Sequence, residues 1–511
     1  MPTIKRALLS VTDKTGLAEF ARELHRLGVE LISTGGTHRA ILDAGVPAME
    51  VAEVTGFPEM LDGRLKTIHP RVAGGILAMR GKPAHMDALR LHGIPEIDLV
   101  VVNLYEFEKV AARPEASLDE LIENIDIGGP TMIRAAAKNW RDVAVVVSPD
   151  DYTALIEEMR AGGLSEATHW RLAKKAFATT AAYDHAIGER LSRAGEAGPA
   201  TLPATLDIRA PRLLALRYGE NPHQSAALYG GGAEGIAGAR QLQGKELSYN
   251  NLVDLDAAWQ LIREFDSGPA AAIIKHTNPC GCAAQATLAE SYRKALEADP
   301  VSAFGGVLAF NLPLDEETAA EVAKLFVEAI AAPGYSPAAL HTLAAKKNLR
   351  LLQVSGGASR DLVIKSIGGG YLAQTPDLER LNRSEARVAT ERAPSEAEWA
   401  ALEFGWKVVK HVKSNAIVFA RPGQSVSAGA GQMSRVDSVK VGAMKAVLPL
   451  QGTVLASDAF FPFPDGIEEA AKHGITAVVQ PGGSVRDDEV TAAANRLGLA
   501  MVFTGIRHFR H

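Results

Sequence analysis

From residue 5 onward, short apolar runs alternate with longer stretches in which apolar residues recur at helical spacing. The apolar runs are rich in Val, Leu and Ile, which is typical of strands buried on both faces of a parallel sheet. A helix-rich segment follows over residues 152–193. We therefore predict an α/β fold with a helix-covered parallel sheet in the first part of the chain. The predicted strands are residues 6–10, 29–33, 98–104 and 143–147, and the first predicted helices are residues 15–27 and 37–44.

A second α/β region follows a change in composition. Residues 194–211 are small, contain prolines and show little periodicity, so we predict a boundary there between domains over 1–200 and 201–511. The strings Ile-Ile-Lys-His at 273–276 and Val-Val-Lys-His at 408–411 hint that the second domain has two lobes. Its predicted strands are residues 270–275, 306–311, 362–367, 416–420 and 477–480, and its predicted helices are residues 254–264, 288–297, 316–330 and 395–413.

Composition narrows the classes of function. A chain of 511 residues with 47% hydrophobic residues is long enough for two or three cores. The formal net charge of -6 provides no basic field, so we expect no nucleic-acid partner and only local binding of anions. No apolar run is long enough to span a membrane, and the two cysteines, one residue apart, suit a reducing compartment. We therefore expect a cytoplasmic protein without a membrane segment.

Two strand-to-helix junctions in the first domain could bind an anion. The string Ser-Thr-Gly-Gly-Thr at 33–37 follows a predicted strand, where free backbone amides and a helix N-terminus favour phosphate. An ordinary glycine turn with a threonine cap explains the same string equally well. The string Ser-Val-Thr-Asp-Lys at 10–14 ends the first predicted strand and would line the same crevice, with helix capping as its alternative role.

Charged and polar residues gather on further loops of the first domain. Arg64, Lys66 and His69 lie in a short segment bounded by glycine and proline, which suggests recognition of a phosphorylated substrate, although a solvated basic loop is the alternative. Four more polar residues lie at or beyond predicted strand ends, with no metal or nucleotide-cofactor motif beside them. Asp126 and Lys138 would each be a satisfied surface residue in most proteins. However, four separate strand-to-helix junctions each supply Lys, Arg, Tyr or Asp, and this convergence indicates acid–base or electrostatic chemistry on a phosphorylated small molecule. These four residues are Asn103, Tyr105, Asp126 and Lys138.

The second domain offers a Lys-His pair. Lys275 and His276 follow an apolar strand, and α/β active sites usually form at the carboxyl ends of strands. A histidine that titrates near neutral pH can act as a base, and an adjacent cation can stabilise a developing oxyanion, as acyl transfer to an amine requires. Upstream, Arg217 can bind a phosphate, and Tyr218 offers a flat ring and a hydroxyl.

Cys280 and Cys282 suggest a zinc site, but their spacing argues against it. Zinc deaminases use His-x-Glu followed by Pro-Cys-x-x-Cys, whereas here the spacing is Cys-x-Cys and no His-x-Glu precedes it. Reduced, buried thiols are the better interpretation. Downstream, several glycine-rich or aromatic loops each carry a strong polar group, although a plain turn explains each loop taken alone. These loops are residues 302–306, 413–415, 428–435 and 457–465.

Six strings spread along the chain carry a family resemblance. They are Ser-Thr-Gly-Gly-Thr, Arg-Leu-Lys-Thr-Ile-His-Pro, Ile-Asp-Ile-Gly-Gly, Arg-Tyr-Gly-Glu-Asn-Pro-His-Gln, Lys-His-Thr-Asn-Pro-Cys-Gly and Ser-Asp-Ala-Phe-Phe-Pro-Phe. In this order they resemble the bifunctional phosphoribosylaminoimidazolecarboxamide (AICAR) formyltransferase and IMP cyclohydrolase of purine biosynthesis. The resemblance implies a first domain similar to methylglyoxal synthase and a second domain of two lobes similar to cytidine deaminase, without zinc.

The resemblance implies one reaction for each domain. The second domain would transfer the formyl group of 10-formyltetrahydrofolate to AICAR, and the first would close the formylated product, FAICAR, to IMP with loss of water. No metal would be required. In formyl transfer, His276 would deprotonate the attacking amine and Lys275 would assist at the formyl oxygen. The residues implied for ring closure are Lys66, Tyr105, Asp126 and Lys138.

The resemblance also implies ligand-binding residues and a homodimer with formyltransferase sites at the subunit interface. Glu328 is one methylene longer than the aspartate expected at its position, which puts its contact in doubt. Folate would lie near Asp465 and Val436. The nucleotide-binding residues implied in the first domain are Ser10, Thr12, Asp13, Lys14, Thr34, Gly35, Gly36, Thr37, Arg64, Thr67 and Asn103. Those implied in the second domain are Arg217, Tyr218, Gly305, Glu328, Asn415, Arg435, Phe460 and Arg507.

Two other classes of protein stay open at this point. A nucleotide-sensing regulatory protein could share the first domain and bind without turnover, but it would have no reason to keep Lys275 and His276 together with the lysines of the first domain. A metal-dependent deaminase is the alternative enzyme. Stoichiometric zinc that is essential for activity would support the deaminase.

Overall fold

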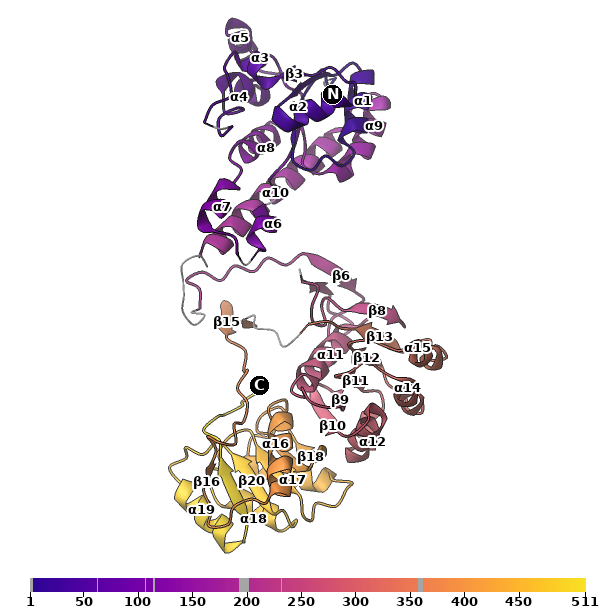
Figure 1. Cartoon of the computed structure of the whole chain (residues 1–511), viewed down its shortest axis with the longest axis vertical. Coiled ribbons are helices and arrows are strands. Elements are labelled where there is room, and N and C mark those ends of the chain that lie inside the picture. The colour runs from indigo at the N-terminus through magenta and orange to yellow at the C-terminus, as the bar shows by residue number, and fades with distance from the viewer. Residues whose placement is uncertain are drawn as a thin grey trace. The chain divides into compact units, whose positions relative to one another are not determined.

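The computed structural model divides into two units, Met1–Thr201 (unit 1) and Leu202–His511 (unit 2), shown in Figure 1. Residues 194–201 of the predicted linker lie outside the described residues. The residues that the structure describes are 3–61, 63–105, 107–113, 115–192, 202–230, 232–356 and 362–511.

Unit 1 contains a five-stranded sheet in the order β3-β2-β1-β4-β5, and all of its strand pairs are parallel. Alternate residues of β1 pack on opposite faces: Leu9 contacts the core under α1 (Leu17–Arg26) and α9 (Tyr152–Arg160), whereas Leu8 contacts the core under α4 (Pro70–Leu77) and α8 (Gly128–Lys138). The order of strands reverses between β1 and β4, which is where α/β sheets usually open a ligand crevice. The strands are β1 (Arg6–Val11), β2 (Glu30–Ser33), β3 (Met49–Glu50), β4 (Leu99–Asn103) and β5 (Ala144–Val146).

Helices cover both faces of this sheet, so the parallel α/β fold predicted for the first part of the chain is confirmed. The second helix begins at Gly35, two residues before its predicted start, so the Gly-Gly pair forms the first turn of that helix. The helices are α1 (Leu17–Arg26), α2 (Gly35–Asp43), α3 (Val51–Thr55), α4 (Pro70–Leu77), α5 (Pro83–Leu91), α6 (Phe107–Ala111), α7 (Leu118–Glu123), α8 (Gly128–Lys138), α9 (Tyr152–Arg160) and α10 (Glu166–Ser192).

Unit 2 contains a twelve-stranded mixed sheet built from two lobes, residues 249–353 (lobe 1) and 396–503 (lobe 2). Each lobe runs through a helix, an antiparallel strand pair and three further helix–strand steps. Lobe 1 comprises α11 (Tyr249–Ile262), β9 (Ala270–Lys275), β10 (Asn278–Ala284), α12 (Leu288–Ala298), the short α13 (Pro300–Ala303), β11 (Val307–Phe310), α14 (Glu316–Val322), β12 (Ala329–Ala332), α15 (Pro337–Leu343) and β13 (Arg350–Gln353). Lobe 2 comprises α16 (Glu396–Val409), β17 (Ile417–Arg421), β18 (Gln424–Gly429), α17 (Arg435–Lys445), β19 (Val454–Ser457), α18 (Asp465–Ala471), β20 (Ala477–Gln480), α19 (Asp487–Arg496) and β21 (Ala500–Phe503).

The two lobes join through the antiparallel pair β10–β18, where Ala283 faces Gln424. On either side of this pair, equivalent strands follow in the same order, β9-β11-β12-β13 in lobe 1 and β17-β19-β20-β21 in lobe 2. The lobes are therefore related by an approximate two-fold axis. The outer strands are β8 (Arg240–Gln243) and β16 (Arg387–Val388), and the two separate hairpins are β6 (Arg212–Leu216) with β7 (Ala226–Tyr229) and β14 (Val363–Ile367) with β15 (Gly370–Gln374).

Side-chain contacts repeat between the lobes as well. Asp458 Oδ1 accepts a hydrogen bond from the Ala416 amide at 3.1 Å, and Asn311 Oδ1 accepts the equivalent bond from the Ala270 amide at 2.8 Å. The hydroxyls of Ser438 and Ser291, each on the fourth residue of its helix, donate to the carbonyls of Asn415 and Pro269 at 2.8 and 2.9 Å. By the same alignment, Leu288 takes the place of Arg435.

One helix predicted for the second domain is wrong over its second half. The helix predicted over 316–330 ends at Val322, and residues 329–332 form β12. This strand is buried on both faces between β11 and β13, and a short continuous apolar run cannot be distinguished from a helix by periodicity. The strand at 362–367 exists as β14, but it belongs to a hairpin outside the large sheet. The string at 408–411 ends α16 and so does not correspond to β9, although the two lobes that it hinted at are present.

We expect Gly281→Ala to destabilise unit 2. A Cβ atom at this position of β10 would lie 1.9 Å from the carbonyl oxygen of Ala295, so α12 would have to move away from the sheet. Overpacking of this kind costs about 1–3 kcal/mol. Calorimetric unfolding measures the effect, with Gly368→Ala as the matched control because a Cβ there meets no atom within 4 Å. Equal transition temperatures for the two variants would contradict the prediction.

Candidate functional site

In unit 1, the carboxyl end of β1 is held between β4 and α2. The Asn103 side chain accepts hydrogen bonds from the amides of Thr12 (2.5 Å) and Asp13 (2.9 Å) and donates to the Asp13 carbonyl (3.1 Å). On the other side, Thr37 Oγ1 accepts from the Val11 amide at 3.0 Å. Asn103 and Thr37 thus fix the loop that follows β1, and the side chains of Thr12 and Asp13 stay exposed.

The N-terminus of α2 lies beside two lysine ammonium groups. A Cβ on Gly35 would lie 3.6 Å from Lys66 Nζ, and a Cβ on Gly36 would lie 4.0 Å from Lys14 Nζ. Lys66 also pairs with Glu59 at 2.9 Å. The first amides of a helix lack partners within the helix, and its dipole favours negative charge. Together these groups provide the setting that a phosphate requires.

Two more predicted residues lie next to this helix end. The hydroxyls of Ser10 and Thr34 are 3.1 Å apart, so the ends of β1 and β2 converge there. Arg64, by contrast, forms an ion pair with Glu123 of α7. Both side chains of that pair are largely exposed, so Arg64 can exchange partners at little cost.

Asp126 caps the N-terminus of α8. Its Oδ1 accepts from the Gly129 amide at 2.8 Å. Burial raises the pKa of Asp126, although hydrogen bonds from the amides of Gly129, Tyr105 and Gly128 oppose the increase. A Cβ on Gly128 would lie 2.9 Å from Thr67 Oγ1, so the segment that carries Lys66 reaches the same helix end. The structure therefore brings Lys66, Tyr105 and Asp126 into one neighbourhood.

Tyr183 is a contact of this site that the sequence did not indicate. Its hydroxyl accepts from the Asp126 amide at 2.8 Å and donates to the Asn124 carbonyl at 3.3 Å. Tyr183 lies inside the long amphipathic α10, where nothing distinguishes it from an ordinary core aromatic. It fixes the backbone from which Asp126 projects.

Lys138 lies away from the other three residues predicted for ring closure. It is the last residue of α8, whereas Asp126 precedes the first turn of that helix. Ten residues of α-helix span about 15 Å. Lys138 is exposed at that far end, near the start of β5 and thus at the opposite edge of the sheet.

In unit 2, strand register places most of the predicted residues along one edge of the large sheet. The β9–β10 turn, the loop before β11 and the start of β12 meet there from lobe 1. The start of β17 and the ends of β18 and β19 meet there from lobe 2. The facing pairs that fix this edge are Lys275–Asn278, Ile274–Val307, Ile417–Gly429 and Ile417–Ser457.

Lys275 and His276 lie in the tight turn between β9 and β10. Lys275 Nζ donates to the Phe304 carbonyl at 2.8 Å, and this carbonyl directly precedes Gly305. Asn278 joins the turn to lobe 2, because its side chain donates to the His276 carbonyl (3.2 Å) and accepts from the Lys413 amide (3.0 Å). The His276 ring itself is exposed at the sheet edge.

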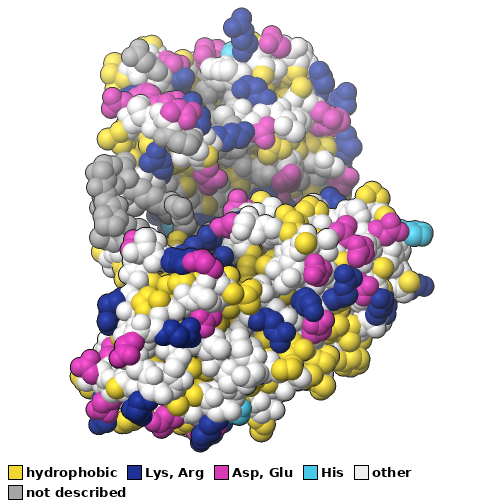
Figure 2. Space-filling model, turned by 60° about the horizontal axis from the view of Figure 1, so that its bottom comes forward, with side chains coloured by type: hydrophobic (Ala, Val, Ile, Leu, Met, Phe, Trp, Pro, Cys, Tyr) yellow, Lys and Arg dark blue, Asp and Glu magenta, His cyan; other side chains and the backbone are white. Residues whose placement is uncertain are grey.

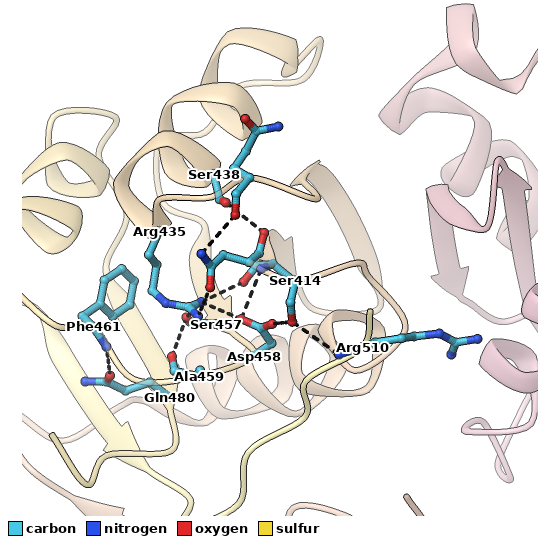
Figure 3. Close-up of polar contacts among 12 residues, drawn as sticks. Ser414, Arg435, Ser438, Ser457, Asp458, Ala459, Phe461, Gln480 and Arg510 are labelled. Atoms are coloured by element: carbon cyan, nitrogen blue, oxygen red, sulfur yellow. Dashed lines mark hydrogen bonds and ion pairs between the residues drawn. The ribbon is translucent and has the colours of Figure 1, made fainter. Parts of the chain in front are cut away.

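A buried ion pair organises the lobe 2 side of this edge (Figure 3). The Arg435 guanidinium, whose side chain is 5% exposed, donates to Asp458 Oδ1 at 2.5 Å, and the Asp458 side chain is fully buried. The same guanidinium donates to Ser457 Oγ and to Asn415 Oδ1, both at 2.8 Å. Ser414 binds the other oxygen of Asp458. Arg435 is therefore bonded to several protein acceptors, and it orients Asn415.

The remaining predicted residues border this edge without forming one cluster. Glu328 precedes β12 and pairs with Arg350 at 2.7 Å. Arg217 lies over the Tyr218 ring, 5.6 Å from its centroid, and their loop contacts the start of α11 through the Glu220 carbonyl. The other four lie in lobe 2 or just after it. They are Val436 in α17, Phe460 after β19, Asp465 at the start of α18 and Arg507 after β21.

A second buried network joins the lobes behind this edge. Lys410 Nζ contacts Glu264 Oε1 at 2.9 Å, and His411 Nε2 contacts the same oxygen at 3.2 Å. Arg510 donates to His411 Nδ1 at 3.0 Å, so Nε2 carries the proton and the imidazole is neutral. Burial lowers the pKa of His411 to about 4. Burial alone would raise the pKa of Glu264, but its partners outweigh burial and lower that pKa to about 2.

Both cysteines are free thiols in β10. Burial raises the pKa of Cys280 to about 12 and raises that of Cys282 as well, so both stay protonated near neutral pH. Within the described ranges, no group of three His, Cys, Asp or Glu side chains could hold a metal ion.

Comparisons with known proteins agree with this architecture. An MGS-like domain matches residues 16–131, so fold and site define a two-domain enzyme whose first domain is MGS-like. The AICARFT/IMPCHase bienzyme family matches residues 136–445, more than half of the chain, and the chain belongs to that family. It is thus an AICAR formyltransferase and an IMP cyclohydrolase of purine biosynthesis, and the family uses 10-formyltetrahydrofolate as formyl donor. A solved structure titled "Crystal structure of ForH" is 37% identical over 37% of this chain and 98% of its own, with a TM-score of 0.33.

We expect Arg435→Leu to destabilise unit 2 by about 3–5 kcal/mol, because it leaves the Asp458 carboxylate buried without its cation. The double variant Arg435→Leu/Asp458→Asn reproduces the neutral pair of lobe 1 and should recover much of that loss. Urea unfolding measures both variants. Lys440→Gln, at an exposed position of the same helix, should change stability by less than about 0.5 kcal/mol. A double variant no more stable than the single one would contradict the prediction.

We expect the free energy of unfolding of unit 2 to fall as pH decreases from about 6.5 to about 4. In this window His411 binds a proton in the unfolded chain but not in the folded chain, so acid favours unfolding. His411→Gln should flatten the slope there. His341→Gln, at an exposed position, should not. Denaturant unfolding as a function of pH tests this, and equal slopes for wild type and His411→Gln would exclude the proposed titration.

Proposed function

We propose that unit 1 carries the cyclohydrolase site and unit 2 the formyltransferase site. The observation that carries the second assignment is the Lys275–His276 turn, which lies at the same sheet edge as Asn415 and Arg435. The observation that carries the first is the convergence of Lys66, Tyr105 and Asp126 beside the N-termini of α2 and α8.

In formyl transfer, His276 removes a proton from the AICAR amine as its nitrogen attacks the formyl carbon of 10-formyltetrahydrofolate. The Lys275 ammonium stabilises the negative charge that develops on the formyl oxygen. Collapse of the tetrahedral intermediate breaks the bond to N10, which takes a proton and leaves as tetrahydrofolate. Asn415, oriented by Arg435, offers hydrogen bonds to the nucleotide, and Val436 and Asp465 lie on the folate side.

In ring closure, the carboxamide nitrogen of FAICAR attacks its formyl carbon, and the resulting carbinolamine loses water. Both groups belong to one molecule, so the site mainly has to hold them together and move protons. Asp126, whose burial raises its pKa, can accept a proton from the amide nitrogen and return one to the leaving hydroxyl. Lys66 and Lys14, with the α2 N-terminus, bind the nucleotide phosphate. Neither reaction requires a metal.

A homodimer is also part of the proposal. The hairpin β14–β15 forms a sheet of only two strands, and its Ile367, Tyr371 and Leu372 are 48%, 65% and 57% exposed. A two-stranded ribbon is at best marginally stable alone, so a second copy of the chain that covers it would stabilise it. This supports formyltransferase sites completed at a subunit interface, where Arg217, Tyr218, Glu328, Phe460 and Arg507 could converge.

We also propose that the protein is cytoplasmic and has neither a membrane nor a nucleic-acid partner. In the part of the chain that the structure describes, no helix is long and apolar enough to cross a membrane. Free thiols fit the reducing cytoplasm. On the face shown in Figure 2, Lys and Arg side chains are interspersed with Asp and Glu, which fits small-molecule substrates better than a nucleic-acid partner.

We expect His276→Ala and Lys66→Ala to separate the two activities. His276→Ala should slow formyl transfer by about 100-fold or more and still cyclise supplied FAICAR, because its unit 1 is intact. Lys66→Ala should do the reverse. Purified protein is assayed with AICAR and 10-formyltetrahydrofolate for the first step and with FAICAR for the second. Loss of both activities in either variant would argue against separate sites, and nucleotide binding without turnover by wild type would favour a sensor.

A further inference from the structure

The turn that carries Lys275 and His276 has an unusual backbone. Among the described residues, positive φ outside glycine occurs at Leu61, His276 and Thr277, with φ of 52° at His276 and 62° at Thr277. Two consecutive left-handed residues with side chains are disfavoured, because Cβ crowds the following carbonyl. Thr277 is also β-branched, for which positive φ is a genuine outlier. Two-residue hairpin turns take positive φ at both central residues but favour Asn, Asp or Gly there, so a His-Thr pair in this turn needs support from outside it.

Asp254, in the second turn of α11, binds the amides of both residues. Its Oδ1 accepts from the Thr277 amide at 2.7 Å, and its Oδ2 accepts from the His276 amide at 3.2 Å. Hydrogen bonds to an ionised carboxylate are about twice as strong as neutral ones. One carboxylate thus engages the two strained residues together, and α11 is anchored by Leu252 and Leu255 in the core shared by the two lobes.

The backbone of His276 determines where its ring projects. Its amide is held by Asp254, and its carbonyl accepts from Asn278 at 3.2 Å. Lys275, one residue earlier, is fixed separately by the Phe304 carbonyl. If the turn relaxed to ordinary φ values, the imidazole would move relative to the lysine ammonium. A displacement of about 1 Å can reduce a catalysed rate by about 100-fold.

We propose that Asp254 is a positioning residue for formyl transfer: its carboxylate holds the left-handed His276–Thr277 turn and so aims the His276 imidazole at the reacting amine. This inference rests on the proposed role of Lys275 and His276. It assigns Asp254 no contact with substrate. Asp254 should therefore affect kcat far more than the KM for AICAR.

The test measures formyl transfer and FAICAR cyclisation in the full chain. Asp254→Ala should lower kcat for formyl transfer by about 10- to 100-fold, change the KM for AICAR by less than about threefold and leave cyclisation unchanged. The matched control is Asp315→Ala, which removes a carboxylate–amide bond of similar length (2.7 Å to Thr318) in the same lobe. This control should keep wild-type kcat.

Glycine rescue separates positioning from a general loss of stability. Glycine adopts positive φ freely, so Thr277→Gly should restore at least about threefold of kcat when added to Asp254→Ala. Wild-type kcat in Asp254→Ala, or no rescue by Thr277→Gly, would overturn the proposal. If Asp254→Ala folds poorly on its own, kcat is measured in the double variant Asp254→Ala/Thr277→Gly. Undiminished formyl transfer in His276→Ala would instead overturn the catalytic assignment, whatever Asp254→Ala does.

Discussion

The lobe 2 side of the large sheet depends on the ion pair between Arg435 and Asp458. Two charges with little access to water need polar partners inside the protein, and here Ser457, Asn415 and Ser414 provide them. Because Arg435 starts α17 and its partners lie at the end of β19 and just before β17, one interaction fixes three elements. Asn415 therefore reaches the sheet edge in a set orientation before any ligand arrives.

The two units hold their cationic side chains in different ways. In unit 1, Lys14 and Lys66 lie on loops beside a helix N-terminus, and the Lys66 side chain is 28% exposed. Such side chains can adjust as a substrate enters and leaves. In unit 2, the guanidinium of Arg435 is bonded to protein groups, and it affects the sheet edge by orienting Asn415. Under the proposed assignment of the two reactions, a unimolecular ring closure can tolerate mobile contacts, whereas transfer between two bound molecules demands fixed geometry.

Sequence patterns predicted β1, β2, β4 and β5 of unit 1 because strands buried on both faces are continuous in Val, Leu and Ile, and they missed β3, which has two exposed residues. They also placed Lys275 and His276 at a strand end. They failed over 316–330, where an apolar run forms β12, and they grouped Lys138 with residues at the other end of α8. The contacts of Asp254, Tyr183 and Asn278 could not be predicted. Each of these side chains bonds to a backbone amide or carbonyl that lies far away along the chain. Every residue has such backbone groups, so the sequence does not show which one a side chain will bind.

The approximate two-fold axis of unit 2 has an evolutionary consequence. Two copies of an ancestral half-size chain, joined edge to edge through β10 and β18, would have presented two identical edges. In a single chain the two edges are encoded separately, so each can change alone. One edge kept Arg435, Asp458 and Asn415, while the other now holds Leu288, Asn311 and Pro269 at the matching positions. The ancestral symmetry thus survives in the backbone, and the chemistry has become asymmetric.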